Sequence, residues 1–379
     1  MRLSLLLIGR QLRRSPGELF RLVPTLAVLA TLLLTLLAIG DTLERRSTGL
    51  LRALDADAFV FDDESRGQVL RSRVPRPATI GAGFADSVHE IGVFAALPTT
   101  VEDGLGTTRA TLVGFNARTP AEPVRVLAGR LPLDGQPRVA AVDATLAGRG
   151  IGLGDSVVLG DSLEVEVVGI VASAMFLQQP TVWVPQDTWA RTGARAFPER
   201  GYADALVGVA AVQGRSDATF EQLRSELQEE LTEVGVEVLS PRQARASVPG
   251  VTAQRATFGA LVAVAAIVVG IVMAAVAANA IEQERPRDAQ LRAIGVPGPV
   301  LATLAAGRLA VIAVATLLVS VGLTGGLARL VPEVVPLALS GTAVFTATVT
   351  VLVALAVGAT PAIRRVLNAD PVDAMRRNA

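Results

Sequence analysis

Four long apolar segments without a charged side chain constrain the fold of this chain more than any motif does. They cover residues 22–40, 256–281, 309–328 and 334–363, and a polar stretch over residues 41–255 separates the first from the others. A hydrocarbon core about 30 Å thick requires about 20 helical residues to cross it. We therefore predict an α-helical membrane protein with four transmembrane helices in a one-plus-three arrangement and one large domain outside the bilayer.

Composition excludes several classes of function. The chain has no cysteine, which rules out thiol catalysis and cysteine metal sites, and its single histidine, His89, cannot form a histidine metal cluster. The formal net charge is zero, so no basic surface indicates a nucleic-acid partner. All 35 basic residues are arginine. A Walker A loop needs a lysine on the nucleotide phosphates, so a driving ATPase has to be another polypeptide.

Arginines near the ends of the spans predict the orientation in the membrane. They cluster in residues 1–21, 282–308 and 364–379, which the positive-inside rule places in the cytoplasm together with both termini. The polar stretch 41–255 is then extracytoplasmic. Residues 1–21 are interpreted as an amphipathic segment on the cytoplasmic headgroups or, alternatively, as a plain juxtamembrane arginine cluster.

Two pairs of small residues inside the spans have the spacing that lets helix backbones approach closely. They are Gly322 with Gly326, and Ala274 with Ala278. A helix-packing role at a dimer interface is one interpretation, and chance spacing in alanine-rich helices is the other. The spans contain no ionisable residue, which argues against a proton- or sodium-driven transporter.

Periodicity in the polar stretch predicts an α+β domain. Large apolar residues recur at spacings of three and four over residues 217–234, which predicts a helix, and a strand over 236–239 follows Gly235. Alternation of apolar and charged residues predicts a hairpin of two strands, 157–159 and 163–168. Further strands are expected at 109–115, 139–142 and 181–184.

Two other features of this stretch have more than one interpretation. The apolar residues Ala174–Leu177 fall in an expected loop, where they either pack in the core or form an exposed contact for lipid or a partner. The consecutive acids Asp62–Glu64 form either a solvated loop or a cation site. No catalytic set of nucleophile, base and acid is recognisable, so the chain is not expected to be an enzyme.

The loop between the second and third spans carries a recognisable pattern. Residues 279–295 form a charged stretch that closes with Leu-Arg-Ala-Ile-Gly at 291–295. This pattern resembles the cytoplasmic loop of the FtsX/MacB-like family of ABC transporter permeases. The tail 368–376, in which Asp-Pro precedes Ala-Met-Arg, is similar to the ending of that family.

The polar stretch resembles the same family. Residues 127–132, 139–146, 152–155 and 168–170 are similar to its periplasmic core domain. The size of the stretch and the lack of a fused ATPase are most similar to the separate permeases of the DevC and LolC type. The resemblance therefore implies a permease subunit in the bacterial plasma membrane.

The resemblance also implies partners. A second permease copy, identical or paralogous, would complete a dimer, and a cytoplasmic ABC ATPase subunit would bind ATP and Mg, so that this chain needs no cofactor. The charged loop would dock on the ATPase; the alternative is a solvated loop that only connects helices. The residues given this ATPase-coupling role are Glu282, Glu284, Arg285, Arg287, Asp288, Leu291 and Arg292.

The function implied by the resemblance is mechanical. ATP hydrolysis by the partner would move the extracytoplasmic domain, which would export or extract amphiphilic cargo such as a lipid, a lipoprotein, a peptide or a drug. Two alternatives stay open. One is an FtsX-like signalling subunit that regulates cell-wall hydrolases through an extracytoplasmic partner protein, and the other is a membrane-anchored binding protein without an ATPase.

Overall fold

The structure of the chain, a computed structural model, forms two compact units, which we describe in turn. The membrane unit comprises Met1–Thr42 and Arg255–Ala379, and the extracytoplasmic unit comprises Leu43–Gln254. The residues that the structure describes are 16–75, 85–103, 106–160, 163–196, 206–283, 290–291, 295–330 and 340–368.

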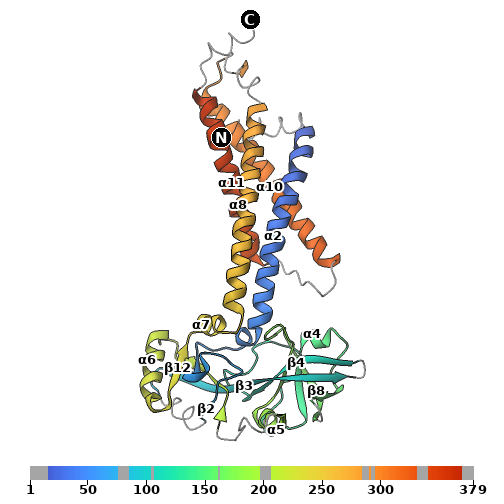
Figure 1. Cartoon of the computed structure of the whole chain (residues 1–379), viewed down its shortest axis with the longest axis vertical. Helices are drawn as coiled ribbons and strands as arrows, with labels where there is room; N and C mark the ends of the chain where they lie inside the picture. Colours follow the sequence, from blue (N-terminus) through green and yellow to red (C-terminus); the bar gives the residue numbers. More distant parts are fainter. Residues whose placement is uncertain are drawn as a thin grey trace. The chain divides into compact units, whose positions relative to one another are not determined.

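Four long helices carry the apolar segments (Figure 1). They are α2 (Pro16–Ala53), α8 (Val251–Gln283), α10 (Gly298–Leu330) and α11 (Gly341–Asn368). Within the described residues, each contains a stretch long and apolar enough to cross a bilayer. The prediction of four transmembrane helices in a one-plus-three arrangement is therefore confirmed.

The helices are longer than the apolar runs that predicted them. Helix α2 begins at Pro16, where a proline is well accommodated in a first turn, and it continues beyond Gly40 to Ala53. Helix α10 begins at Gly298, well before the predicted start of the third span. Residues 334–339 of the predicted fourth span lie outside the described residues, as do 1–15 of the N-terminal segment.

Side chains from all four helices share one apolar cluster in the membrane unit. It includes Leu26 of α2, Val269 of α8, Leu309 of α10 and Val351 of α11. The Ser320 hydroxyl on α10 shares its single proton between the Thr316 carbonyl oxygen of its own helix, at 2.7 Å, and the Ala27 carbonyl oxygen on α2, at 3.1 Å. Such a bond stabilises helix association in lipid by about 0.6–2 kcal/mol.

The extracytoplasmic unit is built on one large mixed sheet. Its strand order, over the described residues, is β12-β1-β11-β3-β4-β9-β6-β8-β5, and β7 pairs with both β3 and β8. These last pairings close β3, β4, β9, β6, β8 and β7 into a ring, which is a small barrel. The strands are β1 (Ala58–Asp62), β2 (Val74–Pro75), β3 (Val88–Asp103), β4 (Gly106–Phe115), β5 (Val126–Gly129), β6 (Val139–Asp143), β7 (Ser156–Leu159), β8 (Leu163–Val171), β9 (Thr181–Pro185), β10 (Leu206–Val207), β11 (Val209–Gly214) and β12 (Val236–Leu239).

Alternating residues of these strands fill the barrel. Leu112, Val142 and Val182 are fully buried in its interior cluster. Helix α5 (Gln186–Ala196) adds Trp189 to the same cluster, and a Cβ placed on Gly114 of β4 would lie 2.6 Å from the Trp189 Cγ atom. Glycine at 114 therefore allows α5 to pack directly on the barrel strand.

A second lobe covers the other end of the sheet. Helix α6 (Phe220–Glu230) packs Leu223 and Leu227 against strands β1, β11 and β12, at the end of this unit opposite the short helix α4 (Ala144–Ala147) (Figure 1). Thr219 caps α6 reciprocally with Gln222, which satisfies two of the free N–H groups at its start. Helix α7 (Pro241–Ala246) follows β12.

The elements expected from periodicity are confirmed. The predicted helix is α6 with the 3₁₀ turn Thr232–Val234, and the predicted hairpin is the antiparallel pair β7–β8. The strands predicted near residues 109, 139, 181 and 236 are β4, β6, β9 and β12. With helices packed on a mixed sheet, the α+β prediction for this domain is also confirmed.

The acidic residues at 62–64 have a structural role. The Asp62 carboxylate accepts a hydrogen bond of 3.0 Å from the Glu64 N–H and so caps the 3₁₀ helix Asp63–Ser65. Among the described residues no group of acids or histidine is arranged to hold a metal ion. His89 is exposed on β3.

Candidate functional site

The predicted ATPase-coupling loop is only partly covered by the structure. Glu282 lies exposed in the last turn of α8, and Leu291 is half-buried in a helical segment. Gly295, which closes the family pattern, has a φ of +94° that residues with a side chain rarely adopt. Glu284, Arg285, Arg287, Asp288 and Arg292 lie outside the described residues.

The predicted helix-packing residues have different surroundings. A Cβ placed on Gly322 or Gly326 of α10 would meet no atom within 4 Å. Ala274 lies in a close contact within the chain, because a Cβ on Gly358 of α11 would overlap its backbone oxygen and Cα atom. Ala278 is half-buried on α8. The Gly322 pair thus faces open space in one copy of the chain, whereas Ala274 meets α11.

These surroundings predict opposite effects of glycine substitutions in the membrane unit. Gly358→Ala should lower the free energy of unfolding by about 1–3 kcal/mol, because α8 and α11 must separate to admit the methyl group. Gly322→Ala and Gly326→Ala should leave unfolding unchanged within about 0.5 kcal/mol. Denaturant unfolding in detergent micelles compares the three variants, and an unaffected Gly358→Ala protein would contradict the close packing.

The most unusual contact in the extracytoplasmic unit joins the end of α2 to the loop between β8 and β9. We name this contact the joint: residues Arg46–Leu50 of α2 and residues Ala174–Gln179 of the loop. Leu50 donates its N–H to the Met175 oxygen at 3.1 Å, and Leu177 donates its N–H to the Ser47 oxygen at 3.2 Å. A third bond of 3.1 Å runs from the Gln178 N–H to the Arg46 oxygen. A helix side is therefore bonded to a loop through main-chain groups, whose geometry does not depend on side-chain rotamers.

Glycine at position 49 makes this approach possible. A Cβ there would lie 2.6 Å from the Met175 oxygen and 3.0 Å from the Ala174 carbonyl carbon. Both are backbone atoms of a buried loop, so no flexible side chain can move aside. Inside a helix glycine costs about 0.5–1 kcal/mol relative to alanine, and here the close contact accounts for its presence.

The loop side of the joint is buried and tightly folded. Ala174, Met175 and Phe176 are buried, and Phe176 and Gln179 exchange two backbone hydrogen bonds of 2.9 Å. Leu177 and Gln178 between them both have positive φ. Of the two interpretations of residues 174–177, core packing is therefore confirmed.

A buried carboxylate anchors the loop to the sheet. Asp143, at the end of β6, is fully buried and accepts hydrogen bonds from the N–H groups of Ala174 at 2.5 Å and Thr145 at 2.7 Å. Burial raises the pKa of this carboxyl above its ordinary value of 3.8, while the two N–H groups and the positive charge of Arg46 oppose the rise. Asp143 thus connects the barrel to the loop that holds α2.

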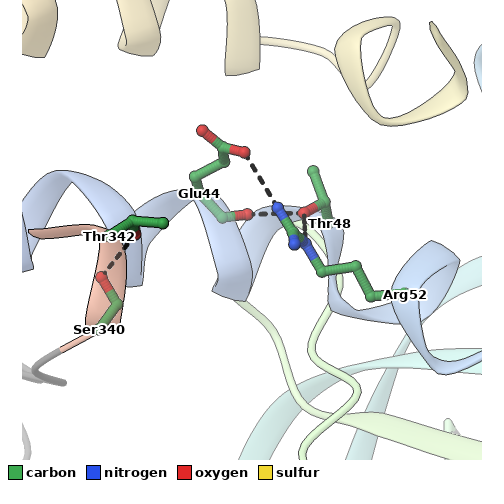
Figure 2. A network of polar contacts seen from close by, with 5 residues as sticks. All are labelled: Glu44, Thr48, Arg52, Ser340 and Thr342. Atoms are coloured by element: carbon green, nitrogen blue, oxygen red, sulfur yellow. Dashed lines mark hydrogen bonds and ion pairs between the residues drawn. The ribbon is translucent and has the colours of Figure 1, made fainter. Parts of the chain in front are cut away.

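Side-chain hydrogen bonds also stabilise the segment of α2 that contacts the loop. Arg52 donates to the Thr48 hydroxyl from Nε at 3.0 Å and to the Glu44 carboxylate from Nη2 at 3.0 Å, as Figure 2 shows. The Thr48 hydroxyl donates to the Glu44 carbonyl oxygen at 2.9 Å. The network spans two turns and links residues on one face of the helix segment that the loop contacts.

Apart from the apolar character of its loop, no sequence pattern predicted the joint. Gly49 is one glycine in a long helix, and Asp143 matches a common helix cap, since it also caps α4. A glycine in a helix just beyond a membrane span, with no turn signal beside it, was the available clue. Close backbone approach is a recognised reason for such a glycine.

The match that decides the family is to the MacB-like periplasmic core domain, over residues 25–230, which is more than half of the chain. It begins within α2, ends with α6 and includes the entire joint. The chain belongs to the FtsX/MacB-like ABC transporter permeases. Combined with four apolar helices, this makes the protein a multi-pass membrane permease with a MacB-like extracytoplasmic domain.

Two solved structures similar to this permease are domains outside the membrane. The periplasmic region of MacB from Actinobacillus actinomycetemcomitans has 13% sequence identity and a TM-score of 0.39, covering 52% of this chain and 95% of that structure. The extracellular domain of the noncanonic ABC-type transporter YknZ from Gram-positive bacteria has 18% identity and a TM-score of 0.38, covering 48% and 98%. No curated protein sequence matches this chain.

Proposed function

We propose that this permease is moved by a separate cytoplasmic ABC ATPase and that its extracytoplasmic domain uses the motion to export or extract amphiphilic cargo. The partner would bind ATP and Mg, and a second permease copy would complete the complex. Both termini and the loop with Arg285 and Arg287 would face the cytoplasm, and the membrane would be the bacterial plasma membrane. Lipids, lipoproteins, peptides and drugs are the classes of cargo that fit the family.

One observation carries this proposal: two transmembrane helices end inside the same rigid core. Leu50 and Leu51 of α2 and Val251 of α8 belong to one buried cluster with Phe59 and Phe176. Within the extracytoplasmic unit, a displacement of either helix end therefore has to move the sheet or break this core. Close-packed interiors transmit such displacements because they resist deformation.

The joint supports a mechanical role further. Three main-chain hydrogen bonds hold α2 to the loop, and Asp143 holds the loop to β6. An anchor that only held the domain at the membrane would function equally well through a flexible linker. The backbone contact at Gly49 instead prevents the helix from sliding against the loop.

Co-purification tests the ATPase partnership. The tagged permease is isolated in mild detergent from its own cells, and the eluate is analysed by mass spectrometry and by an ATPase assay. We expect a stoichiometric P-loop ATPase with the wild type and at least about tenfold less with Arg285→Glu/Arg287→Glu, since two charges of the predicted docking surface are reversed.

The matched control is Arg242→Glu on α7, an exposed arginine of the extracytoplasmic unit, which should leave the ATPase bound. A clean preparation without any ATPase would refute the proposal and favour a membrane-anchored binding protein. Full retention by the double variant would contradict docking through the loop.

A further inference from the structure

The loop side of the joint contains a two-residue turn with an unfavourable backbone conformation. Phe176 and Gln179 exchange their backbone hydrogen bonds, so Leu177 and Gln178 are the central residues of this turn. Their φ values are +49° and +64°. Positive φ at both central residues is the sign pattern of a type I′ turn, where glycine and asparagine are favoured because other side chains make it costly. Leucine and glutamine are therefore held in a turn that their own backbone preferences disfavour.

The two central N–H groups of this turn both bond to α2. Leu177 donates to the Ser47 oxygen at 3.2 Å, and Gln178 donates to the Arg46 oxygen at 3.1 Å. A turn with negative φ at both central residues is the mirror image of this one, so it would direct the two N–H groups away from the helix. Strained conformations persist only where the surrounding contacts determine them. The bonds to α2 therefore favour the strained turn, and withdrawal of α2 would let it relax.

Helix α2 has an alternative partner for the groups that bond to the loop. In an uninterrupted helix, the Leu50 N–H bonds to the Arg46 oxygen one turn earlier. In the joint each of these two groups has a partner in the loop, because Leu50 donates to the Met175 oxygen at 3.1 Å and Arg46 accepts from Gln178. If the turn is released, Leu50 and Arg46 bond to each other, so neither group is left without a partner. The side-chain network of Figure 2 spans the same turn of helix and stabilises it in either case.

The base of the loop is fixed independently of α2. The Asp143 carboxylate accepts the Ala174 N–H, and Phe176 is fully buried in the core. By contrast, the Gln178 side chain is exposed and that of Leu177 is half-buried. The part of the loop that is free to rearrange is therefore the two-residue turn.

We propose that the joint is a releasable coupling with two arrangements. In the closed arrangement, which the structure shows, the turn bonds to α2, and a displacement of α2 moves the domain. In the open arrangement, residues 177 and 178 have negative φ, the Leu50 N–H bonds to the Arg46 oxygen, and α2 moves without the domain. The inference concerns regulation of the proposed motion and rests on that proposal for its biological role. The equilibrium between the arrangements requires no ATPase, so the two ideas fail separately.

Substitutions at Gln178 shift this equilibrium without removing a buried side chain. Gln178→Gly should favour the closed arrangement, since glycine adopts positive φ freely, and Gln178→Val should favour the open one, since β-branched residues rarely do. Exchange of single amides is measured by mass spectrometry with electron-transfer fragmentation, on the full permease in detergent without an ATPase, and is corrected for intrinsic rates. We expect the amides of residues 177 and 178 to exchange about fivefold more slowly in the glycine variant and about fivefold faster in the valine variant.

The Leu50 amide distinguishes an exchange of hydrogen bonds from local unfolding. It is bonded to Met175 in the closed arrangement and to Arg46 in the open one, so its exchange should stay within about twofold in wild type and both variants. A Leu50 amide that accelerates together with residues 177 and 178 would show unfolding of the helix end and overturn the bond exchange. Equal exchange of residues 177 and 178 in all three proteins would overturn the two arrangements.

Arg118→Gly is the matched control. Arg118 also has a positive φ, of +60°, and an exposed side chain, but it lies outside the joint. The substitution relieves a similar backbone cost, so it should leave the amides of residues 177 and 178 unchanged. An effect on these amides equal to that of Gln178→Gly would overturn the assignment of the strain to the joint.

The regulatory role is measured in the complex with the ATPase. A non-hydrolysable ATP analogue should change exchange of the amides of residues 177 and 178 about two- to tenfold in wild type, and less in Gln178→Gly, whose turn stays closed. A nucleotide-dependent change in residues 44–52 without any change at 177 and 178 would overturn the regulatory role, while the result in the isolated permease decides the two arrangements.

Discussion

Gly49→Ala should lower the free energy of unfolding of the extracytoplasmic unit by about 1–3 kcal/mol, and Gly49→Val should lower it by more. The reason is the overlap of a new Cβ with the backbone of Met175 and Ala174, at 2.6–3.0 Å. In an unobstructed helix the alanine variant would be stabilising by about 0.5–1 kcal/mol, so the sign of the effect is diagnostic. Thermal and denaturant unfolding of the full permease in detergent measures it.

Gly148→Ala is the matched control in the same unit. Gly148 has a helical φ of −63°, and a Cβ there would meet its nearest atoms at 3.5 and 3.6 Å, which is ordinary contact. We expect a change of less than about 0.5 kcal/mol. A Gly49→Ala protein as stable as Gly148→Ala would contradict the close approach of α2 to the loop.

Asp143→Ala should destabilise the same unit by about 2–5 kcal/mol, because the buried N–H of Ala174 and the half-buried N–H of Thr145 both lose their acceptor. Asp155→Ala is the matched control. The Asp155 carboxylate also accepts from a backbone N–H, that of Gly152 at 2.7 Å, but it is exposed, so water can replace it. The control should lose less than about 1 kcal/mol, and equal losses in the two variants would contradict the anchoring role of Asp143.

The pH dependence of this effect has a definite sign. Because burial raises the pKa of Asp143 in the folded protein, the folded state binds its proton more readily than the unfolded chain does. The contribution of Asp143 to stability is therefore fully present below its ordinary pKa of 3.8 and declines as the pH rises through the folded pKa. The stability difference between wild type and the non-titrating Asp143→Asn should be larger at about pH 4.5 than at about pH 7.5.

The sequence analysis predicted correctly those helices and strands whose burial is visible in the spacing of apolar residues within the segment itself. Apolar runs such as 256–281 have no stable alternative to a membrane helix, and α6 shows its buried stripe in the spacing of Leu223 and Leu227. Strand β8 alternates because one face lines the barrel and the other is exposed or half-buried.

Other elements were missing from the prediction because their pattern depends on distant partners. Strand β3 contains Pro98, which usually argues against an interior strand. Proline is tolerated there because, among the described strands, none pairs with β3 beside Pro98 on the edge away from β4, so the missing N–H leaves no ladder bond unmade. Strands β1 and β11 are short apolar runs, which periodicity alone does not distinguish from buried helix segments.

The joint could not be predicted either, because its contacts also depend on residues that are far apart in the sequence. Gly49 and Met175 are far apart in sequence, and the positive φ values of Leu177 and Gln178 belong to residues that do not usually adopt them. The family pattern at 291–295 could be recognised because it is local. The contacts of the joint could not, because they join α2, the loop and β6, which are far apart in sequence, through main-chain hydrogen bonds and the Asp143 carboxylate.

The most direct test of the central claim is hydrogen exchange of the permease in complex with its ATPase, with and without a non-hydrolysable ATP analogue. The claim is that ATP binding moves α2 and, through the joint, the extracytoplasmic domain. We predict a nucleotide-dependent change in peptides covering residues 44–52 and 174–179, and loss of this change in Gly49→Ala. Identical exchange of these peptides in both nucleotide states, in a complex that hydrolyses ATP, would contradict it.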